Sequence, residues 1–117
     1  MTYSAFIVDD ERPARKRVAD LLRSELDIRI AAQCGDAFEA RDALDRDRPD
    51  ILFLDVQMPE LTGFDLLQAL PDGLEPAVIF TTAHEQHAVR AFGVNAVDYL
   101  LKPFTKARFQ MALAKAR

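Results

Sequence analysis

The sequence holds little cysteine or glycine and no long hydrophobic run. A single cysteine, Cys34, excludes an internal disulfide framework and fits a reducing compartment. The four glycines form no glycine-rich loop, so binding of a nucleotide or flavin is poorly supported. No hydrophobic run approaches the roughly 20 residues that a membrane-spanning helix needs. The N-terminus lacks the basic region of a secretory signal. We therefore expect a cytoplasmic protein with no membrane partner.

The acidic balance of the chain limits its partners further. The net charge is −4 at pH 7, and the isoelectric point lies near 5.1. A chain of this charge is poorly suited to hold nucleic acid by its own electrostatics. Half of the 117 residues are hydrophobic, which is enough for a core. The length is usual for one domain, so we expect residues 1–117 to form a single folded unit.

Short hydrophobic strands alternate with amphipathic helices along the chain. Strands are predicted at Tyr3–Val8, Ile28–Cys34, Ile51–Asp55, Ala77–Thr82 and Ala96–Leu101. Helices are predicted at 12–25, after the N-cap residue Asp36, at 63–70, at 84–92, and around Phe109 and Leu113 near the C-terminus. This alternation indicates a doubly wound α/β domain, in which five helices cover both faces of a five-stranded parallel sheet.

Polar side chains follow four of the predicted strands. Asp9 and Asp10 follow the first strand, Asp55 ends the third, Thr82 ends the fourth and Lys102 follows the fifth. In the flavodoxin-like strand order 2-1-3-4-5, these four strands are neighbours, and sites in such sheets lie at the carboxyl ends of the strands. Each residue alone is typical of a turn or a helix cap. Their joint placement at neighbouring strand ends favours a functional site.

The chemistry of such a cluster is specific. Carboxylates packed together repel one another, and a cation relieves that repulsion. Oxygen ligands with several retained waters suit Mg²⁺, with Mn²⁺ as a substitute. A carboxylate beside Mg²⁺ can act as a nucleophile and form an acyl phosphate. An ammonium such as that of Lys102 and a hydroxyl such as that of Thr82 can then contact the phosphoryl oxygens.

The motifs that carry these residues resemble the receiver domain of bacterial two-component response regulators. They are "VDDE", "LFLDVQMPELTGFDLL", "VIFTTA" and "AVDYLLKPF", and they occur in this order within Tyr3 to Leu113. The resemblance implies that Asp55 is the phosphoacceptor. It also implies that Asp10 binds Mg²⁺ directly, that Asp9 binds it mostly through water, and that the backbone carbonyl of Gln57 is a further ligand.

The same resemblance assigns roles around the phosphoryl group. It implies that Thr82 and Lys102 contact that group, and that Tyr99 moves with Thr82 as the aromatic residue of the switch. It also makes the Lys102–Pro103 bond a candidate cis peptide. Leu61 and Thr62 depart from commoner receiver patterns, in the loop after the acceptor, and leave this chemistry intact.

A longer stretch, "AHEQHAVRAFGVNAVDYLLKPF", resembles receivers of the LytR/AlgR class. Such receivers usually carry a C-terminal LytTR DNA-binding domain, which is absent from residues 1–117. The resemblance implies that a histidine kinase phosphorylates Asp55, and that the face formed by helix 84–92, strand 96–101 and the last helix then changes. Nucleic acid would be bound only through the absent output domain. We also expect two copies to associate on phosphorylation, with Arg90, Asp98 and Lys106 pairing across a two-fold axis.

Two alternatives remain open from the sequence. One is a stand-alone receiver that acts through protein–protein interaction. The other is an enzyme, an Mg²⁺-dependent phosphohydrolase with an aspartyl-phosphate intermediate, although the chain leaves little room for a substrate-specific cap. We expect a switch rather than an enzyme, with self-catalysed phosphoryl transfer to Asp55 and slow autodephosphorylation as its only reactions.

Overall fold

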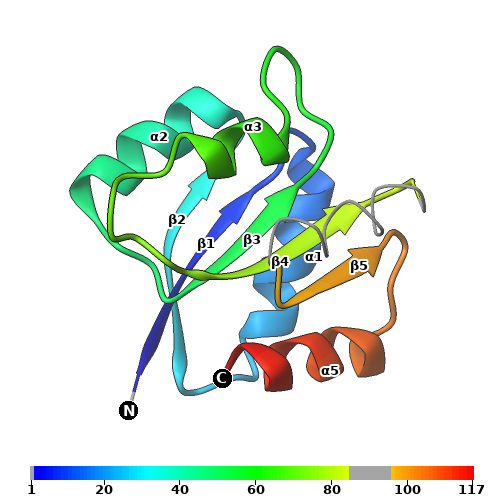
Figure 1. The fold of residues 1–117 in the computed structure, drawn as a ribbon. Helices are drawn as coiled ribbons and strands as arrows, with labels where there is room; N and C mark the ends of the chain where they lie inside the picture. Colours follow the sequence, from blue (N-terminus) through cyan, green and yellow to red (C-terminus); the bar gives the residue numbers. More distant parts are fainter. Residues whose placement is uncertain (1, 85–95) are drawn as a thin grey trace.

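Five parallel strands form one sheet in the computed structural model, which describes residues 2–84 and 96–117. The strands are β1 (Tyr3–Val8), β2 (Ile28–Cys34), β3 (Ile51–Asp55), β4 (Ala77–Thr82) and β5 (Asp98–Leu101). Their order in the sheet is β2-β1-β3-β4-β5 (Figure 1). The predicted flavodoxin-like strand order is therefore confirmed.

Helices cover both faces of this sheet (Figure 1). The described ranges contain α1 (Arg12–Leu22), α2 (Ala37–Arg46), α3 (Gly63–Gln68) and α5 (Lys106–Ala116). The hydrophobic clusters show that α1 and α5 pack on one face and α2 and α3 on the other. The helix predicted at 84–92 lies, apart from His84, outside the described residues. Among the helices of the described ranges, none is long and apolar enough to cross a membrane.

The central strand β3 joins the two halves of the core. Ile51 and Phe53 pack with α1 and α5, whereas Leu52 and Leu54 pack with α2 and α3. Phe53 also stacks on Phe109 of α5, with 5.5 Å between the ring centroids. Because both faces of a parallel sheet are covered, its central strand is a continuous hydrophobic run rather than an alternating one. All of β3 is buried, which fixes the position of its carboxyl end.

Two helices end earlier than the sequence predicts. Helix α1 stops at Leu22, because the N–H of Arg23 bonds back to the carbonyl of Asp20 at 3.3 Å and a turn into β2 follows. Helix α3 stops at Gln68, because the N–H of Ala69 closes a tighter last turn. Polar residues follow α1 and hydrophobic residues follow α3, and neither stretch, 23–25 or 69–70, contains a glycine or proline that would mark the end of the helix in the sequence.

Strand β5 begins later than predicted, at Asp98, and this residue is not the surface charge that we expected. Asp98 is only 2% exposed. Its carboxylate pairs with Arg108 at 2.8 Å and with Lys115 at 3.2 Å, both on α5. A buried carboxylate needs such partners, and here they come from the same chain. The prediction that Asp98 pairs across a two-fold axis is therefore wrong. Lys106 is exposed, and Arg90 lies outside the described residues.

Candidate functional site

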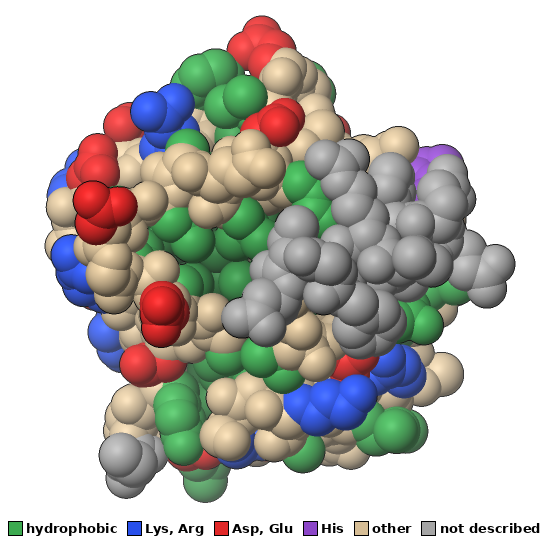
Figure 2. Space-filling model, viewed as in Figure 1, with side chains coloured by type: hydrophobic (Ala, Val, Ile, Leu, Met, Phe, Trp, Pro, Cys, Tyr) green, Lys and Arg blue, Asp and Glu red, His purple; other side chains and the backbone are tan. Residues whose placement is uncertain are grey.

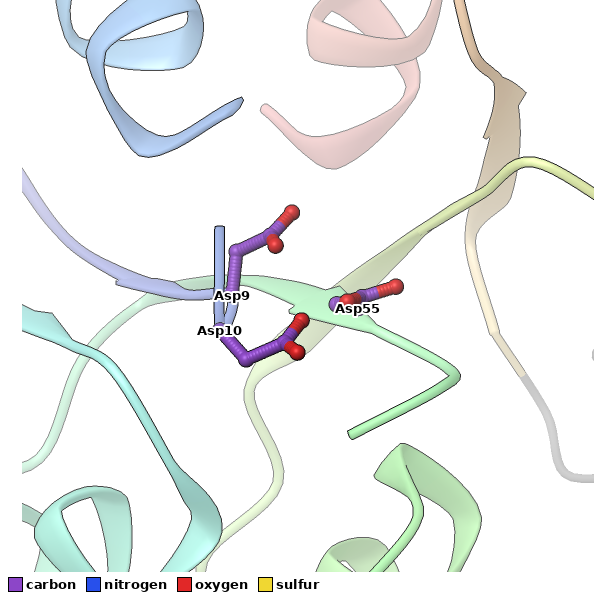
Figure 3. A group of neighbouring side chains, drawn as sticks. All are labelled: Asp9, Asp10 and Asp55. Carbon is purple, nitrogen blue, oxygen red and sulfur yellow. The ribbon is translucent and has the colours of Figure 1, made fainter. Parts of the chain in front are cut away.

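Three carboxylates meet at the carboxyl ends of β1 and β3. One oxygen of each of Asp9, Asp10 and Asp55 lies within 4.8 Å of the others (Figure 3). Strands β1 and β3 are neighbours, and Val8 is opposite Leu54. The residues at these strand ends are therefore brought together although they are far apart in the sequence. Asp9 and Asp55 are buried, while Asp10 is exposed.

The loop after β3 folds back closely against Asp55. The N–H of Gly63 bonds to the carbonyl of Val56 at 2.9 Å. A Cβ at position 63 would lie 2.5 Å from the backbone carbonyl oxygen of Asp55. Only glycine permits this approach without displacing the end of β3. Thr62 then caps α3 through a reciprocal pair of hydrogen bonds with Asp65, which holds the start of α3 beside the acidic cluster.

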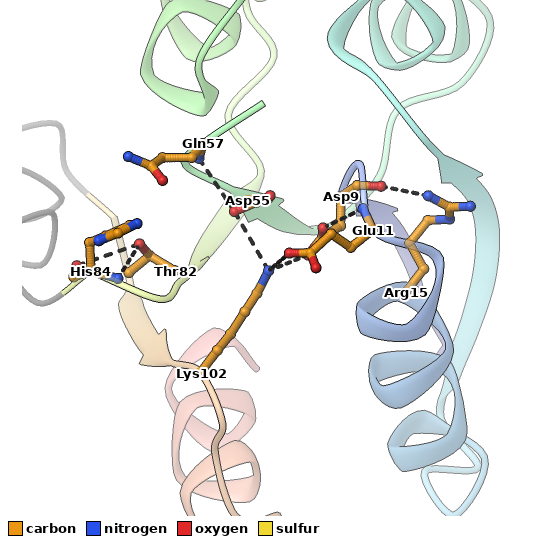
Figure 4. A network of polar contacts seen from close by, with 8 residues as sticks. All are labelled: Asp9, Glu11, Arg15, Asp55, Gln57, Thr82, His84 and Lys102. Atoms are coloured by element: carbon orange, nitrogen blue, oxygen red, sulfur yellow. Dashed lines mark hydrogen bonds and ion pairs between the residues drawn. The ribbon is translucent and has the colours of Figure 1, made fainter. Parts of the chain in front are cut away.

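One lysine reaches the cluster from the position directly after β5. The Nζ of Lys102 lies 2.8 Å from Oδ2 of Asp9, 3.7 Å from Oδ1 of Asp55 and 3.9 Å from Oε1 of Glu11 (Figure 4). The Lys102–Pro103 peptide is cis, as predicted. A single largely buried ammonium therefore faces two buried carboxylates and one exposed carboxylate.

This charge balance shifts the protonation of the cluster. Burial and the neighbouring charge of Asp9 raise the pKa of Asp55 to about 8, and Lys102 offsets only part of that rise. Burial opposes the charge of Lys102, but its hydrogen bond with Asp9 and the charge of Asp55 raise its pKa. Asp55 therefore retains a proton near neutral pH unless a further cation takes its place.

The remaining predicted site residues surround this cluster. The buried hydroxyl of Thr82 accepts from the N–H of His84 at 3.0 Å and donates to its carbonyl at 3.4 Å (Figure 4). The N–H of Gln57 donates to Oδ1 of Asp55 at 3.3 Å, and the Gln57 side chain points away from the cluster. Tyr99 lies on β5 in register with Phe80 of β4. The metal role of the Gln57 carbonyl and the switch role of Tyr99 stay predictions.

Arg15 is a residue that the sequence did not reveal. Its Nη1 donates to the backbone carbonyl of Asp9 at 2.7 Å, whereas the basic run of residues 15–17 by itself is typical of a solvated helix face. This bond fixes the turn from β1 into α1, and with it the positions of Asp9 and Asp10. In the sequence, only the position of Arg15 one turn after Glu11 points to this contact, and many surface arginines occupy a similar position near a helix start.

The donor set fits a hard divalent cation. Three carboxylates supply oxygen ligands, and the exposed side of Asp10 leaves room for water, as Mg²⁺ requires. A cation there would also offset the repulsion that raises the pKa of Asp55.

Comparison with known proteins identifies the family. Residues 5–114 match the family model described as the response regulator receiver domain. The chain belongs to this family. An uncharacterized response regulatory protein of Shewanella oneidensis is 41% identical, over 97% of this chain and 48% of the relative. Transcriptional regulatory protein BtsR of Escherichia coli is also 41% identical, over 95% of this chain and 46% of BtsR. The receiver therefore spans about half the length of these relatives.

Solved receiver structures share the fold. The response regulatory domain of protein mrkE from Klebsiella pneumoniae gives a TM-score of 0.88 at 32% identity, covering 97% of this chain and 93% of that one. The REC domain of AraT from Geobacillus stearothermophilus gives 0.88 at 29% identity, covering 99% and 93%. Phosphorylation and Mg²⁺ binding are general features of the family, and the acidic cluster could hold such an ion.

The raised pKa of Asp55 predicts a pH-dependent gain on removing its charge. Between about pH 4 and pH 8, the folded receiver holds a proton that the unfolded chain has released, so stability falls as pH rises through this window. In EDTA at pH 8, Asp55→Asn should be more stable than the wild type by about 1–2 kcal/mol. The difference should shrink towards pH 5. Urea unfolding at both pH values measures it.

Magnesium should reverse this order. Millimolar Mg²⁺ should stabilise the wild type by mass action and stabilise Asp55→Asn much less. Asp42→Asn, at an exposed position of α2, is the matched control, and its response to Mg²⁺ should equal that of the wild type. The cluster assignment is wrong if Asp55→Asn destabilises the protein in EDTA, or if Mg²⁺ stabilises both proteins equally.

Proposed function

We propose that this receiver is a phosphoacceptor switch in which Asp55 takes a phosphoryl group from a histidine kinase or a small acyl phosphate. The observation that carries the proposal is the position of the buried Asp55 carboxylate, 3.7 Å from Lys102 and within the acidic cluster of Asp9 and Asp10. In this arrangement an oxygen of Asp55 attacks phosphorus. The bond from phosphorus to the donor nitrogen or acyl oxygen breaks, and its electron pair leaves with the donor.

The residues around Asp55 supply the charge that this transfer needs. Asp9, Asp10, Asp55 and the carbonyl of Gln57 would hold Mg²⁺, which, when bound, offsets the negative charge of the phosphoryl oxygens. The Nζ of Lys102 contacts one of those oxygens. The hydroxyl of Thr82 turns from His84 to donate to another, which breaks its two hydrogen bonds with the main chain of His84. Catalysis then consists of positioning and charge neutralisation.

The output is proposed from the relatives. The E. coli relative BtsR is named a transcriptional regulatory protein, and this receiver spans about half of its length. The motif from Ala83 to Phe104 resembles the LytR/AlgR class. We infer a cytoplasmic partner of a histidine kinase that controls transcription through a LytTR DNA-binding domain outside residues 1–117. Phosphorylation would be transmitted through Thr82, Tyr99 and the face that contains β5 and α5.

Intact-mass measurement tests the proposed chemistry. With acetyl phosphate and Mg²⁺, the wild type should gain the mass of one phosphoryl group and keep it for at least seconds. Asp55→Asn should gain none. A phosphohydrolase would instead turn over many substrate molecules without accumulating the phosphoprotein, and that result would refute the switch.

Thr82 should couple phosphorylation to the output face. Thr82→Ala should still accept phosphate at Asp55, but it should lose most of the response of β5 and α5, because the hydroxyl that turns from His84 is missing. NMR shifts induced by beryllofluoride, a phosphate mimic, measure the response. Thr81→Val is the control, since adjacent strand residues point to opposite faces. Equal shifts in Thr82→Ala and the wild type would contradict the coupling.

The same mimic tests association of two copies. Leu101 and Met111 expose hydrophobic side chains on β5 and α5, which supports pairing through this face. Beryllofluoride should raise the apparent mass of the wild type in sedimentation at micromolar to millimolar protein, and raise that of Thr82→Ala much less. A wild type that stays monomeric throughout this range refutes receiver pairing.

A further inference from the structure

Tyr99 lies on an edge of the described sheet, where a strand has no neighbour to bond its outer backbone groups. Here two side chains take that role. Oδ1 of Asp98 accepts the N–H of Tyr99 at 2.8 Å, and Nη2 of Arg108 donates to the carbonyl of Tyr99 at 2.8 Å. Both backbone polar groups of the tyrosine are therefore held by an acid on β5 and a base on α5.

Arg108 also holds the ring of Tyr99. Its guanidinium carbon lies 5.7 Å from the ring centroid, within the range of a cation–π interaction. Two further bonds, of 2.9 and 2.8 Å, join Nη1 and Nη2 to the two oxygens of Asp98. This bidentate pairing fixes the plane of the guanidinium, because the planar fork of arginine matches a carboxylate. The ring, the carbonyl and the carboxylate are thus tied to one side chain of α5.

The carboxylate of Asp98, which holds Arg108 in place, stays ionised at neutral pH. Asp98 is buried, which opposes its charge, but its bonds with Arg108, the Tyr99 N–H and Lys115 hold its pKa at about 2. Lys115 reaches the other side of the same carboxylate, 3.2 Å from Oδ2. Figure 2 shows Lys and Arg side chains gathered over this β5–α5 part of the surface, beside acidic atoms. Lys115 therefore provides a matched control that shares Asp98.

We propose that Arg108 is a positioning residue that latches Tyr99 in the resting arrangement of the switch. The inference rests on the proposed function, in which the unphosphorylated receiver is the resting state. In that state the Thr82 hydroxyl is bonded to the main chain of His84, as it is in this structure. A ring that leaves its place under the guanidinium forfeits the cation–π contact. Arg108 therefore opposes the movement of Tyr99, and α5 sets how readily the switch responds.

Thermodynamic linkage determines whether the loss of Arg108 strengthens or weakens the binding of a phosphate mimic. An interaction that favours the resting arrangement weakens the binding of any ligand that favours the activated arrangement. Removing that interaction must therefore strengthen the binding of that ligand. Arg108→Met should therefore bind beryllofluoride with Mg²⁺ about two- to five-fold more tightly than the wild type, a change of the size of one exposed cation–π contact. In the free protein, the NMR signals of the Tyr99 ring should move towards their beryllofluoride-bound positions.

Two more variants keep the test decisive. Arg108→Lys supplies a cation to Asp98 without the planar fork, so it should change in the same direction, and it carries the test if Arg108→Met does not fold. Lys115→Met removes a partner of Asp98 and should leave the Tyr99 signals and the affinity as in the wild type.

The latch is overturned if the folded Arg108 variants keep the wild-type Tyr99 signals and affinity, or if they bind beryllofluoride more weakly. It is also overturned if Lys115→Met changes as much as the Arg108 variants do. A wild type that fails to bind beryllofluoride with Mg²⁺ refutes the proposed function instead. In that case the Tyr99 ring signals of the free variants still decide whether Arg108 positions the tyrosine.

Discussion

The ammonium of Lys102, placed between the buried carboxylates of Asp9 and Asp55, is the interaction on which this receiver depends. One positive charge cannot balance two buried negative charges, so burial and repulsion raise the pKa of Asp55 to about 8. A cluster in this state favours the binding of a cation, which the proposed phosphoryl transfer to Asp55 would then use. The excess of buried negative charge destabilises the fold, and the proposed chemistry uses the same excess to bind a cation.

The scaffold enforces this arrangement from two sides. Strand β3 is buried on both faces, so Asp55 cannot retreat from the cluster without disturbing the core. The close approach of Gly63 to the carbonyl of Asp55 blocks movement on the loop side. Arg15 fixes the turn that carries Asp9 and Asp10. At the edge of the described sheet, Arg108 of α5 bonds both to the carboxylate of Asp98 and to the carbonyl of Tyr99.

Much of this arrangement could be predicted from the sequence because it follows from periodicity and strand order. The hydrophobic run "ILFL" identified the central strand, and the alternation of strands and helices gave a parallel sheet. Its topology then gathered Asp9, Asp10, Asp55 and Lys102. The roles of Arg15, Asp98 and Arg108 could not be predicted, because they depend on where long side chains reach across elements. A charge such as Asp98 is interpreted as surface until the arginine that buries it is placed.

Titration of the Asp55 carboxyl carbon by NMR tests the central claim most directly. In EDTA, the Asp55 signal should titrate with a pKa near 8, and removing the offsetting charge with Lys102→Met should raise that pKa further. With millimolar Mg²⁺, Asp55 should stay ionised to much lower pH. A pKa of about 4 in EDTA, the ordinary value of an exposed aspartate, would show that Asp55 does not sit in an unbalanced acidic cluster.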